Sequence, residues 1–173
     1  MPPALRPVAV FALASALALA CGACGPASEA EASPTITPVD TLAERDALES
    51  APESVEIEGT SIAVTSAVFL PSEHGASSRG LRVSATLRTR RGEGLPAGLA
   101  LTQVYVVRGA DVWVAPVGAG ARPSSLRGVL EGGAQNGPTW RVGERVDVVV
   151  RVQMANDGSA FLARRAVAIA AAD

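Results

Sequence analysis

Hydrophobic and polar residues alternate one by one along several segments of this chain. In the clearest of them, residues 145–153, the sequence reads RVDVVVRVQ, and only Val149 interrupts the pattern. Neighbouring side chains of a β-strand point to opposite faces of the sheet, so a period of two predicts strands with one buried face. The repetition of this pattern predicts an all-β fold.

Residues 62–70 and 81–88 show the same period, and residues 101–107, 111–117 and 161–170 are further strand candidates. Glycine, serine and proline concentrate in the segments between them. About seven short strands in roughly 115 residues predict an antiparallel immunoglobulin-like β-sandwich, with a small β-barrel as the alternative.

The end of the domain carries local signals of its own. Residues 108–110 (RGA) predict a tight turn, and residues 156–158 (NDG) supply the positive-φ residues that a hairpin favours. Arg164 and Arg165 break the alternation of the last strand, which predicts a β-bulge or a sheet edge there. Residues 140–169 resemble the last two strands of an immunoglobulin-like or fibronectin-like sandwich, without the disulfide of antibody domains.

The first 20 residues have the composition of a secretory signal peptide. Arg6 precedes an uncharged run, VAVFALASALALA at residues 8–20, and the only two cysteines follow at positions 21 and 24. This run is shorter than the roughly 20 apolar residues that span a bilayer. We therefore expect cleavage between Ala20 and Cys21.

This stretch resembles the signal of bacterial lipoproteins, in which a small residue precedes the cysteine that receives the lipid. Ala20 is that small residue, whereas Leu19 stands one position later than the leucine of the usual pattern. The resemblance implies acyl chains such as palmitate on Cys21, a lipid bilayer as partner and, with Gly22 rather than Asp next, delivery to the outer membrane. Cleavage by the ordinary signal peptidase would instead give a soluble secreted or periplasmic protein.

Residues 21–54 are rich in proline, alanine, serine and glutamate, which predicts a disordered tether between the signal peptide, residues 1–20, and a folded domain, residues 55–173. Residues 41–48 could form a short helix, because Thr41 and Glu44 have the spacing of a capping box. An isolated helix of this length is marginal in water.

Charge divides the chain in two. Residues 22–58 contain nine acidic residues and one arginine, a net charge of −8, whereas residues 59–173 contain 13 arginines and eight acidic residues, a net charge of +5. Arg82, Arg88 and Arg151 are therefore candidates for a face that binds an anionic lipid, an anionic glycan or the acidic tether. The alternative is that they are ordinary solvated side chains.

Catalytic and metal-binding patterns are weak. Cys21 and Cys24 have thioredoxin-like spacing but follow an apolar signal, and together with His74 they cannot supply the four ligands of a structural zinc site. Ser77 and Ser78 near His74 do not form a nucleophile motif. We therefore predict no cofactor, no metal and no catalytic residue. The remaining candidates for a pair of catalytic carboxylates are Glu93, Asp111, Glu131 and Asp147, and their spacing brings no two of them together.

Nucleic acid is not an expected partner, because aromatic and basic residues are not interleaved. The two tryptophans, Trp113 and Trp140, are predicted to fill the core of a domain with few aromatic residues. The sequence thus predicts a non-catalytic cell-envelope lipoprotein whose β-sandwich binds or assembles with an envelope protein or an anionic glycan or lipid. The alternative is a protease-inhibitor-like or chaperone-like sandwich that acts through a projecting loop at residues 72–80.

Overall fold

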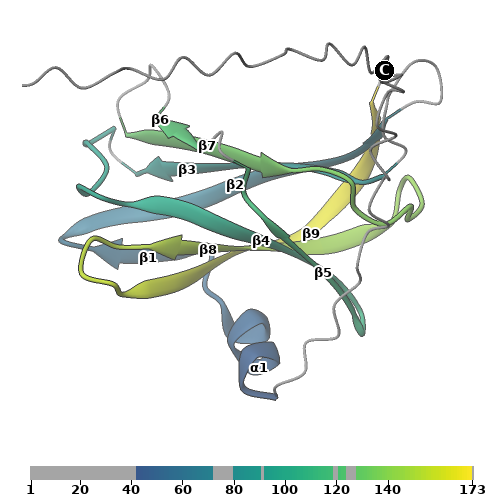
Figure 1. Ribbon diagram of the computed structural model, residues 1–173, viewed down its shortest axis with the longest axis horizontal. Coiled ribbons are helices and arrows are strands. Elements are labelled where there is room, and N and C mark those ends of the chain that lie inside the picture. The colour runs from purple at the N-terminus through teal and green to yellow at the C-terminus, as the bar shows by residue number, and fades with distance from the viewer. Residues whose placement is uncertain (1–41, 72–79, 91, 119–120, 124–127, 173) are drawn as a thin grey trace, which may run out of the picture. The chain divides into compact units, whose positions relative to one another are not determined.

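The computed structural model describes residues 42–71, 80–90, 92–118, 121–123 and 128–172, which form one short helix and nine strands (Figure 1). The helix is α1, Leu42–Ser50. The strands are β1 (Ser54–Ile57), β2 (Thr60–Pro71), β3 (Arg82–Thr89), β4 (Ala100–Arg108), β5 (Asp111–Pro116), β6 (Arg122–Pro123), β7 (Val129–Ala134), β8 (Arg145–Gln153) and β9 (Ser159–Ala172).

The strands form one curled sheet in the order β5-β4-β8-β9-β2-β3-β7-β6, and β1 pairs separately with β2. The long strand β9 joins the two halves of this sheet, because it changes its neighbour along its length. Residues 159–168 of β9 pair with β8, and residues 169–172 pair with β2. The β2–β9 pair is parallel and all other pairs are antiparallel, so the sheet is mixed.

The prediction of an all-β fold is confirmed. The two halves of the sheet pack face to face like the layers of the expected sandwich, but they belong to one continuous sheet that curls like the barrel alternative. The parallel contact between β2 and β9 is the part of the topology that local sequence patterns did not indicate.

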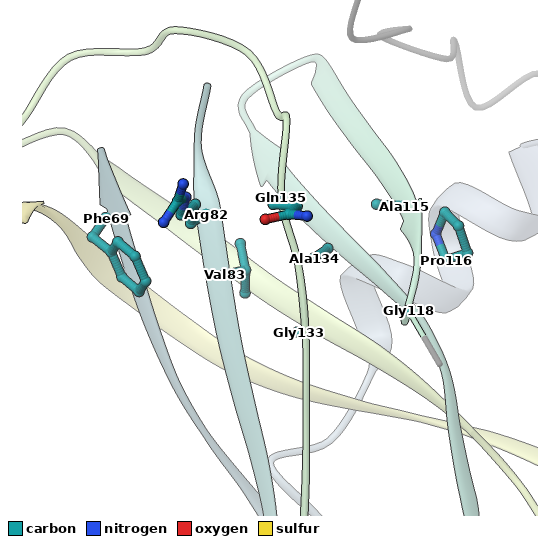
Figure 2. Close-up of a pocket in the computed structure, with 9 residues that line it drawn as sticks. All are labelled: Phe69, Arg82, Val83, Ala115, Pro116, Gly118, Gly133, Ala134 and Gln135. Carbon is teal, nitrogen blue, oxygen red and sulfur yellow. The ribbon is translucent and has the colours of Figure 1, made fainter. Parts of the chain in front are cut away.

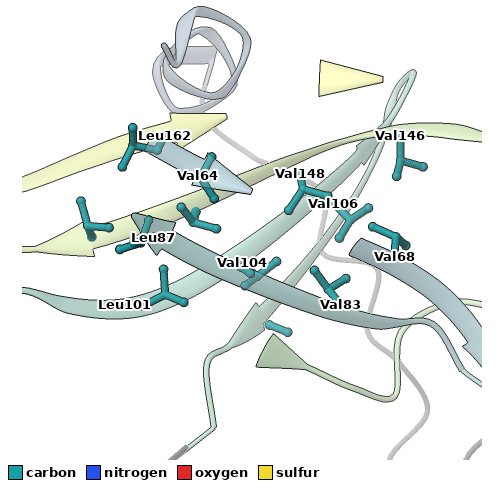
Figure 3. Close-up of a cluster of buried hydrophobic side chains, with 14 of the residues drawn as sticks. Val64, Val68, Val83, Leu87, Leu101, Val104, Val106, Val146, Val148 and Leu162 are labelled. Carbon is teal, nitrogen blue, oxygen red and sulfur yellow. The ribbon is translucent and has the colours of Figure 1, made fainter. Parts of the chain in front are cut away.

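The main core lies between the inner faces of the two halves (Figure 3). Valine and leucine dominate it, and Val104, Val106 and Val148 are fully buried there. The tryptophans predicted to be core residues are confirmed as such, since Trp113 is 3% exposed and Trp140 is 6% exposed. Burial of apolar surface contributes about 25 cal/mol per Å², so this shared core holds the two halves together.

A second, smaller core explains why Val149 interrupts the alternation. Val149 is fully buried on the outer face of β8, where Leu48 of α1 covers it together with Tyr105 and Ala163. The central part of β8 is therefore covered on both faces. A strand buried on both faces is expected to be apolar at consecutive positions, as Val148, Val149 and Val150 are.

Both predicted turns are present. Arg108 pairs directly with Asp111 across a two-residue turn in which Gly109 has φ +56°. Gln153 pairs with Ser159 across the hairpin of residues 154–158, where the positive φ falls on Asp157. Both turns join neighbouring antiparallel strands, as the sequence predicts.

The predicted irregularity at Arg164 and Arg165 is a β-bulge. The register of β8 and β9 shifts there, because Val146 pairs with Val167 whereas Val148 pairs with Arg164. The extra residue lies at Arg165 and Ala166, and Ala166 has φ +53°, a left-handed conformation that costs a non-glycine residue about 1–2 kcal/mol. The Asp147 carboxylate stabilises this conformation by accepting a hydrogen bond of 2.8 Å from the Ala166 amide.

The bulge also directs Arg165 toward the C-terminus of α1. One guanidinium nitrogen lies 3.0 Å from Asp147 Oδ2, and the other donates to the backbone oxygens of Leu48, Glu49 and Ala51 at 2.7–3.1 Å. The last carbonyls of a helix lack partners within the helix, and the helix dipole favours a cation beside them. The last turn of α1 has no basic residue of its own, so Arg165 supplies that cation from the sheet.

The described part of the segment assigned to the tether is packed against the β-domain. Leu48 and Ala51 are 2% and 7% exposed, and the Ala163 amide donates to the Pro52 carbonyl at 2.8 Å. The packed unit thus includes residues N-terminal to position 55. Among the described residues, no helix has the length and apolar character needed to cross a membrane.

We predict that Arg165→Ala destabilises the protein by about 1–3 kcal/mol, because it leaves two helix carbonyls, the Ala51 carbonyl and Asp147 without their charged partner. Arg164→Ala is the matched control, since Arg164 is more exposed and lies 3.9 Å from Glu53 in a weak ion pair. The control should cost at most about 1 kcal/mol. Urea unfolding followed by tryptophan fluorescence measures both, and equal losses in the two variants would contradict the role given to Arg165.

Candidate functional site

The two ends of the curled sheet approach each other without pairing, and the space between them is the candidate site. We call it the seam; β5 bounds one side and β7 bounds the other. Among the strands described, β5 pairs with β4 alone, and β6 pairs with β7 only at Leu130 and Glu131. No described strand pairs with residues 132–134 of β7 on the side of β6, where Ala121 lies against Gly132.

A pocket of about 390 Å³ lies at one end of the seam and is open to solvent. Figure 2 shows β2, β3 and β7 side by side along one flank and the end of β5 on the other. The volume is within the usual range of ligand sites, about 300–1,000 Å³. The lining residues are Phe69, Arg82, Val83, Ala115, Pro116, Gly118, Gly133, Ala134 and Gln135.

Two glycines give β7 its close approach to neighbouring segments. A β-carbon added to Gly132 would lie 2.7 Å from both Leu101 Cδ2 and Val117 Cγ1, so any side chain there would collide with the opposite half of the sheet. A β-carbon on Gly133 would meet the Val83 carbonyl oxygen. The two glycines therefore let Leu101, Val117 and the Val83 carbonyl approach the β7 backbone closely.

The depression continues along the outside of β7. A second hollow of about 330 Å³ shares Val83, Gly118 and Gly133 with the first and extends to Ser84 and Glu131. The two hollows therefore adjoin each other along β7.

Arg82 gives the pocket its positive charge. It is the only charged residue among those that line the 390 Å³ pocket, and it lies beside Phe69, its cross-strand neighbour on β2. Its Nε is buried and has no hydrogen-bond partner among the described residues. A buried donor without a partner costs about 1–3 kcal/mol, so this nitrogen lowers the stability of the fold.

The three arginines proposed as one anionic-partner face lie in two different places. Arg82 and Arg88 share the outer side of β3. Arg151 lies on β8, in the other half of the sheet, where its guanidinium is 3.5 Å from Gln103 Oε1 and 3.4 Å from Ser159 Oγ. The structure thus brings Arg82 and Arg88 to one face and separates Arg151 from them.

Several other sequence candidates fall outside the described residues, namely Cys21, Cys24, His74, Ser77 and Ser78. The loop at residues 72–80 is described only at its last residue. Of the part of the chain that is described, no group of three or more His, Cys, Asp or Glu side chains could hold a metal ion.

Two of the candidate carboxylates bind arginines. Asp147 holds Arg165, and Asp111 lies 2.7 Å from the Arg108 guanidinium. Glu144 also pairs with Arg108 at 3.1 Å, and these two hydrogen-bonded carboxylates raise the pKa of Arg108. The guanidinium lies over the Trp140 ring, 4.6 Å from its centre, so this group stabilises the β4–β5 turn.

Sequence reasoning did not identify Phe69, Pro116, Gly132, Gly133 and Gln135 as site residues. The signal that could have indicated them is the run EGGAQNG at residues 131–137, where two adjacent glycines interrupt a strand. Glycine inside a strand often marks a close approach of another backbone or a ligand.

No protein-family model, no curated protein and no solved structure matches this chain.

A polar group lies at the contact between α1 and the outer face of the sheet. The Tyr105 hydroxyl is 2.9 Å from Gln103 Oε1 and 3.3 Å from Glu44 Oε1, and its ring meets Phe161 edge to face. Burial raises the pKa of Tyr105, the negative charge of Glu44 raises it further, and Arg151 opposes the shift. Glu44 lies in the first turn of α1, so this tyrosine reports on whether α1 is docked.

Tyr105 is the only tyrosine of the chain, so its ionisation can be followed directly by ultraviolet absorbance. We predict a midpoint above 10 in the folded protein and near the ordinary value of about 10 in urea. Above pH 10 the unfolded chain loses the phenolic proton first, so the native state binds more protons and the free energy of unfolding falls as pH rises. Below pH 10 this contribution is fully present. Tyr105→Phe should remove that slope, and identical folded and unfolded titration midpoints would contradict the docked arrangement.

Proposed function

We propose that this protein is a non-catalytic binding module of the cell envelope, attached to the outer membrane by acyl chains on Cys21. The module binds through the seam. The pocket at the seam between β5 and β7 is the observation on which the binding role rests.

The sequence and the contacts of α1 support the proposed attachment through Cys21. Residues 22–41 separate Cys21 from the start of α1, and 20 residues span at most about 70 Å when fully extended. Arg165 and the second core fix α1 to the sheet. The N-terminal segment therefore joins the β-domain through a helix that is packed firmly on it.

The seam lies where α1 does not cover it, so a partner could reach it. In Figure 1, α1 lies at the bottom of the β-domain, whereas β6 and β7 lie at the top. The β7 edge thus lies on the side of the β-domain opposite α1.

The chemistry of the pocket suits recognition. Its lining is mostly apolar, with one arginine and one amide, Gln135. Apolar surface contributes binding free energy through burial, and a small number of polar groups fixes the orientation of a ligand. This combination supports a binding role better than the dispersed arginine face does, since Arg151 lies apart from Arg82 and Arg88.

The lipid attachment is tested by substitution of the two cysteines. We predict that Cys21→Ser moves the protein from the membrane fraction to the soluble fraction and abolishes incorporation of a clickable fatty acid. Several acyl chains are needed for stable anchoring, because each buried CH₂ contributes about 0.8 kcal/mol. Cys24→Ser is the matched control and should keep both the label and the membrane location. A wild-type protein that carries no label would refute the attachment.

The binding role is tested by photo-crosslinking in intact cells. We predict that a photoreactive residue at Gln135, which lines the pocket, gives a discrete adduct, whereas one at Ala168, exposed on β9, does not. Gly132→Val should abolish the adduct from position 135, because a side chain at position 132 collides with Leu101 and Val117. Circular dichroism is the check that this variant is folded. Adducts of equal yield at both positions, or none at position 135, would contradict a binding role for the seam.

A further inference from the structure

Val142 is the only large hydrophobic side chain that is exposed in the described part of the chain, with 55% of its surface accessible. It lies at the corner of a turn that precedes β8, in which the Glu144 amide donates to the Arg141 carbonyl at 3.2 Å. Gly143 has φ +89°, the left-handed conformation that the third position of such a turn requires. A single exposed valine is common on protein surfaces, so its surroundings decide whether it marks a contact.

Hydrogen bonds fix this turn to the sheet. The Gly143 amide donates to the Ile169 carbonyl at 2.8 Å, and the Ile169 amide donates to the Glu144 carbonyl at 2.9 Å. The Glu144 carboxylate also accepts from the Arg108 guanidinium at 3.1 Å, which joins this turn to the neighbouring β4–β5 turn. A turn that is already ordered loses little conformational entropy when it makes a contact.

Two arginines flank the exposed valine. The side chains of Arg141 and Arg145 are exposed, and neither guanidinium has a hydrogen bond or an ion pair with a described residue. The acid of the same turn, Glu144, is paired with Arg108. The tip, which we define as residues 141–145, therefore presents two free guanidinium groups around one apolar side chain.

The tip lies on the side of the domain where α1 begins. The Arg45 guanidinium of α1 donates to the Gly109 carbonyl at 3.2 Å, and the same β4–β5 turn bonds to the tip through Arg108. Since α1 begins at Leu42, the 20 residues that lead to Cys21 join the domain beside these two turns. A second, weak contact with a surface to which the chain is already attached benefits from a high effective concentration.

We propose that the tip binds the surface of an anionic bilayer, with Val142 inserted among the lipid headgroups and the Arg141 and Arg145 guanidiniums paired with lipid phosphates. Guanidinium groups match phosphate oxygens, and the valine gains free energy by leaving water. The inference rests on the proposed function, because the attachment at Cys21 brings the tip within reach of the bilayer. That attachment favours a lipid surface over an acidic protein as the partner.

The contact is local and weak without the anchor. An arginine beside an anionic membrane increases affinity by about fivefold, and the tip supplies two of them. The nearby helix α1 contains three acidic residues and one arginine, so the attraction is confined to the tip. Screening limits it to about 8–10 Å at physiological salt, and the contact should weaken as ionic strength rises. The tip therefore orients the domain on the bilayer, whereas the acyl chains hold it there.

The test uses the full-length lipidated protein in vesicles of phosphatidylcholine mixed with phosphatidylglycerol, or of phosphatidylcholine alone. A fluorescent apolar residue replaces Val142, and quenching by brominated lipids measures its insertion. The same label at Asp157 is the reference, because the hairpin of residues 154–158 lies at the opposite end of β8, about 30 Å away. We expect quenching at position 142 and none at position 157 in the anionic vesicles, and loss of the quenching at 142 in the neutral ones.

Paired substitutions separate the tip from general positive charge. Arg141→Gln combined with Arg145→Gln should abolish the quenching at position 142. Arg88→Gln combined with Arg90→Gln should keep it, since these two exposed arginines lie at the end of β3 in the other half of the sheet. Both pairs remove the same charge from exposed positions, so a difference between them reports the place of the charge and not its amount.

Three results would overturn the proposal: equal quenching at positions 142 and 157, equal quenching at 142 in the two kinds of vesicle, or equal effects of the two arginine pairs. A photoreactive residue at position 142 that captures a protein and no lipid in intact cells would also overturn it, and would identify the other class of partner. The fatty-acid label on Cys21 and the adduct from Gln135 are measured independently of the tip, so the proposed function is judged separately.

Discussion

The β-bulge at Ala166 is the constraint on which the arrangement of this domain depends. It lies where β9 leaves the register of β8, and three residues later β9 begins to pair with β2. A bulge increases local twist and bends its strand, so this extra residue lets one long strand serve both halves of the sheet. Asp147 stabilises the bend by binding the Ala166 amide and the Arg165 guanidinium with its two oxygens. The same carboxylate therefore sets the curl of the sheet and directs the arginine that holds α1.

The curl leads directly to the candidate site. Since the sheet bends on itself, β5 comes close to the end formed by β7 and β6, and Gly132 allows Leu101 and Val117 to pack directly against β7. β6 is only two residues long and covers only part of the β7 edge. The result is a sheet with the curvature of a barrel and an open seam. Natural sheets usually protect their free edges with charge, proline or short length, and here Pro116 and the short β6 do so only in part.

Much of the fold could be predicted from the sequence because it depends on local patterns. The period of two indicates the strands, the NDG and RGA segments indicate the turns, and the paired arginines indicate the bulge. Val149 interrupts the period of two because a helix covers the outer face of β8 at this position. The parallel pairing of β2 with β9 and the seam between β5 and β7 could not be predicted, because they join segments far apart in the sequence with no local signature. For the same reason, the positive charge of residues 59–173 suggests one face for Arg82, Arg88 and Arg151, whereas the sheet order separates Arg151 from the other two.

The central claim is that β9 joins both halves of the sheet into one cooperative unit while the seam stays open. Native-state hydrogen exchange measures this residue by residue, because an amide that opens only on global unfolding reports the full free energy of unfolding. The account predicts that the amides of Ala163 and Ile169, on either side of the bulge, exchange with this same free energy, since both are bonded to backbone carbonyls. It predicts much faster exchange for the outward amides of residues 132–134. Distinct opening free energies for Ala163 and Ile169, or full protection of residues 132–134 in the free protein, would contradict it.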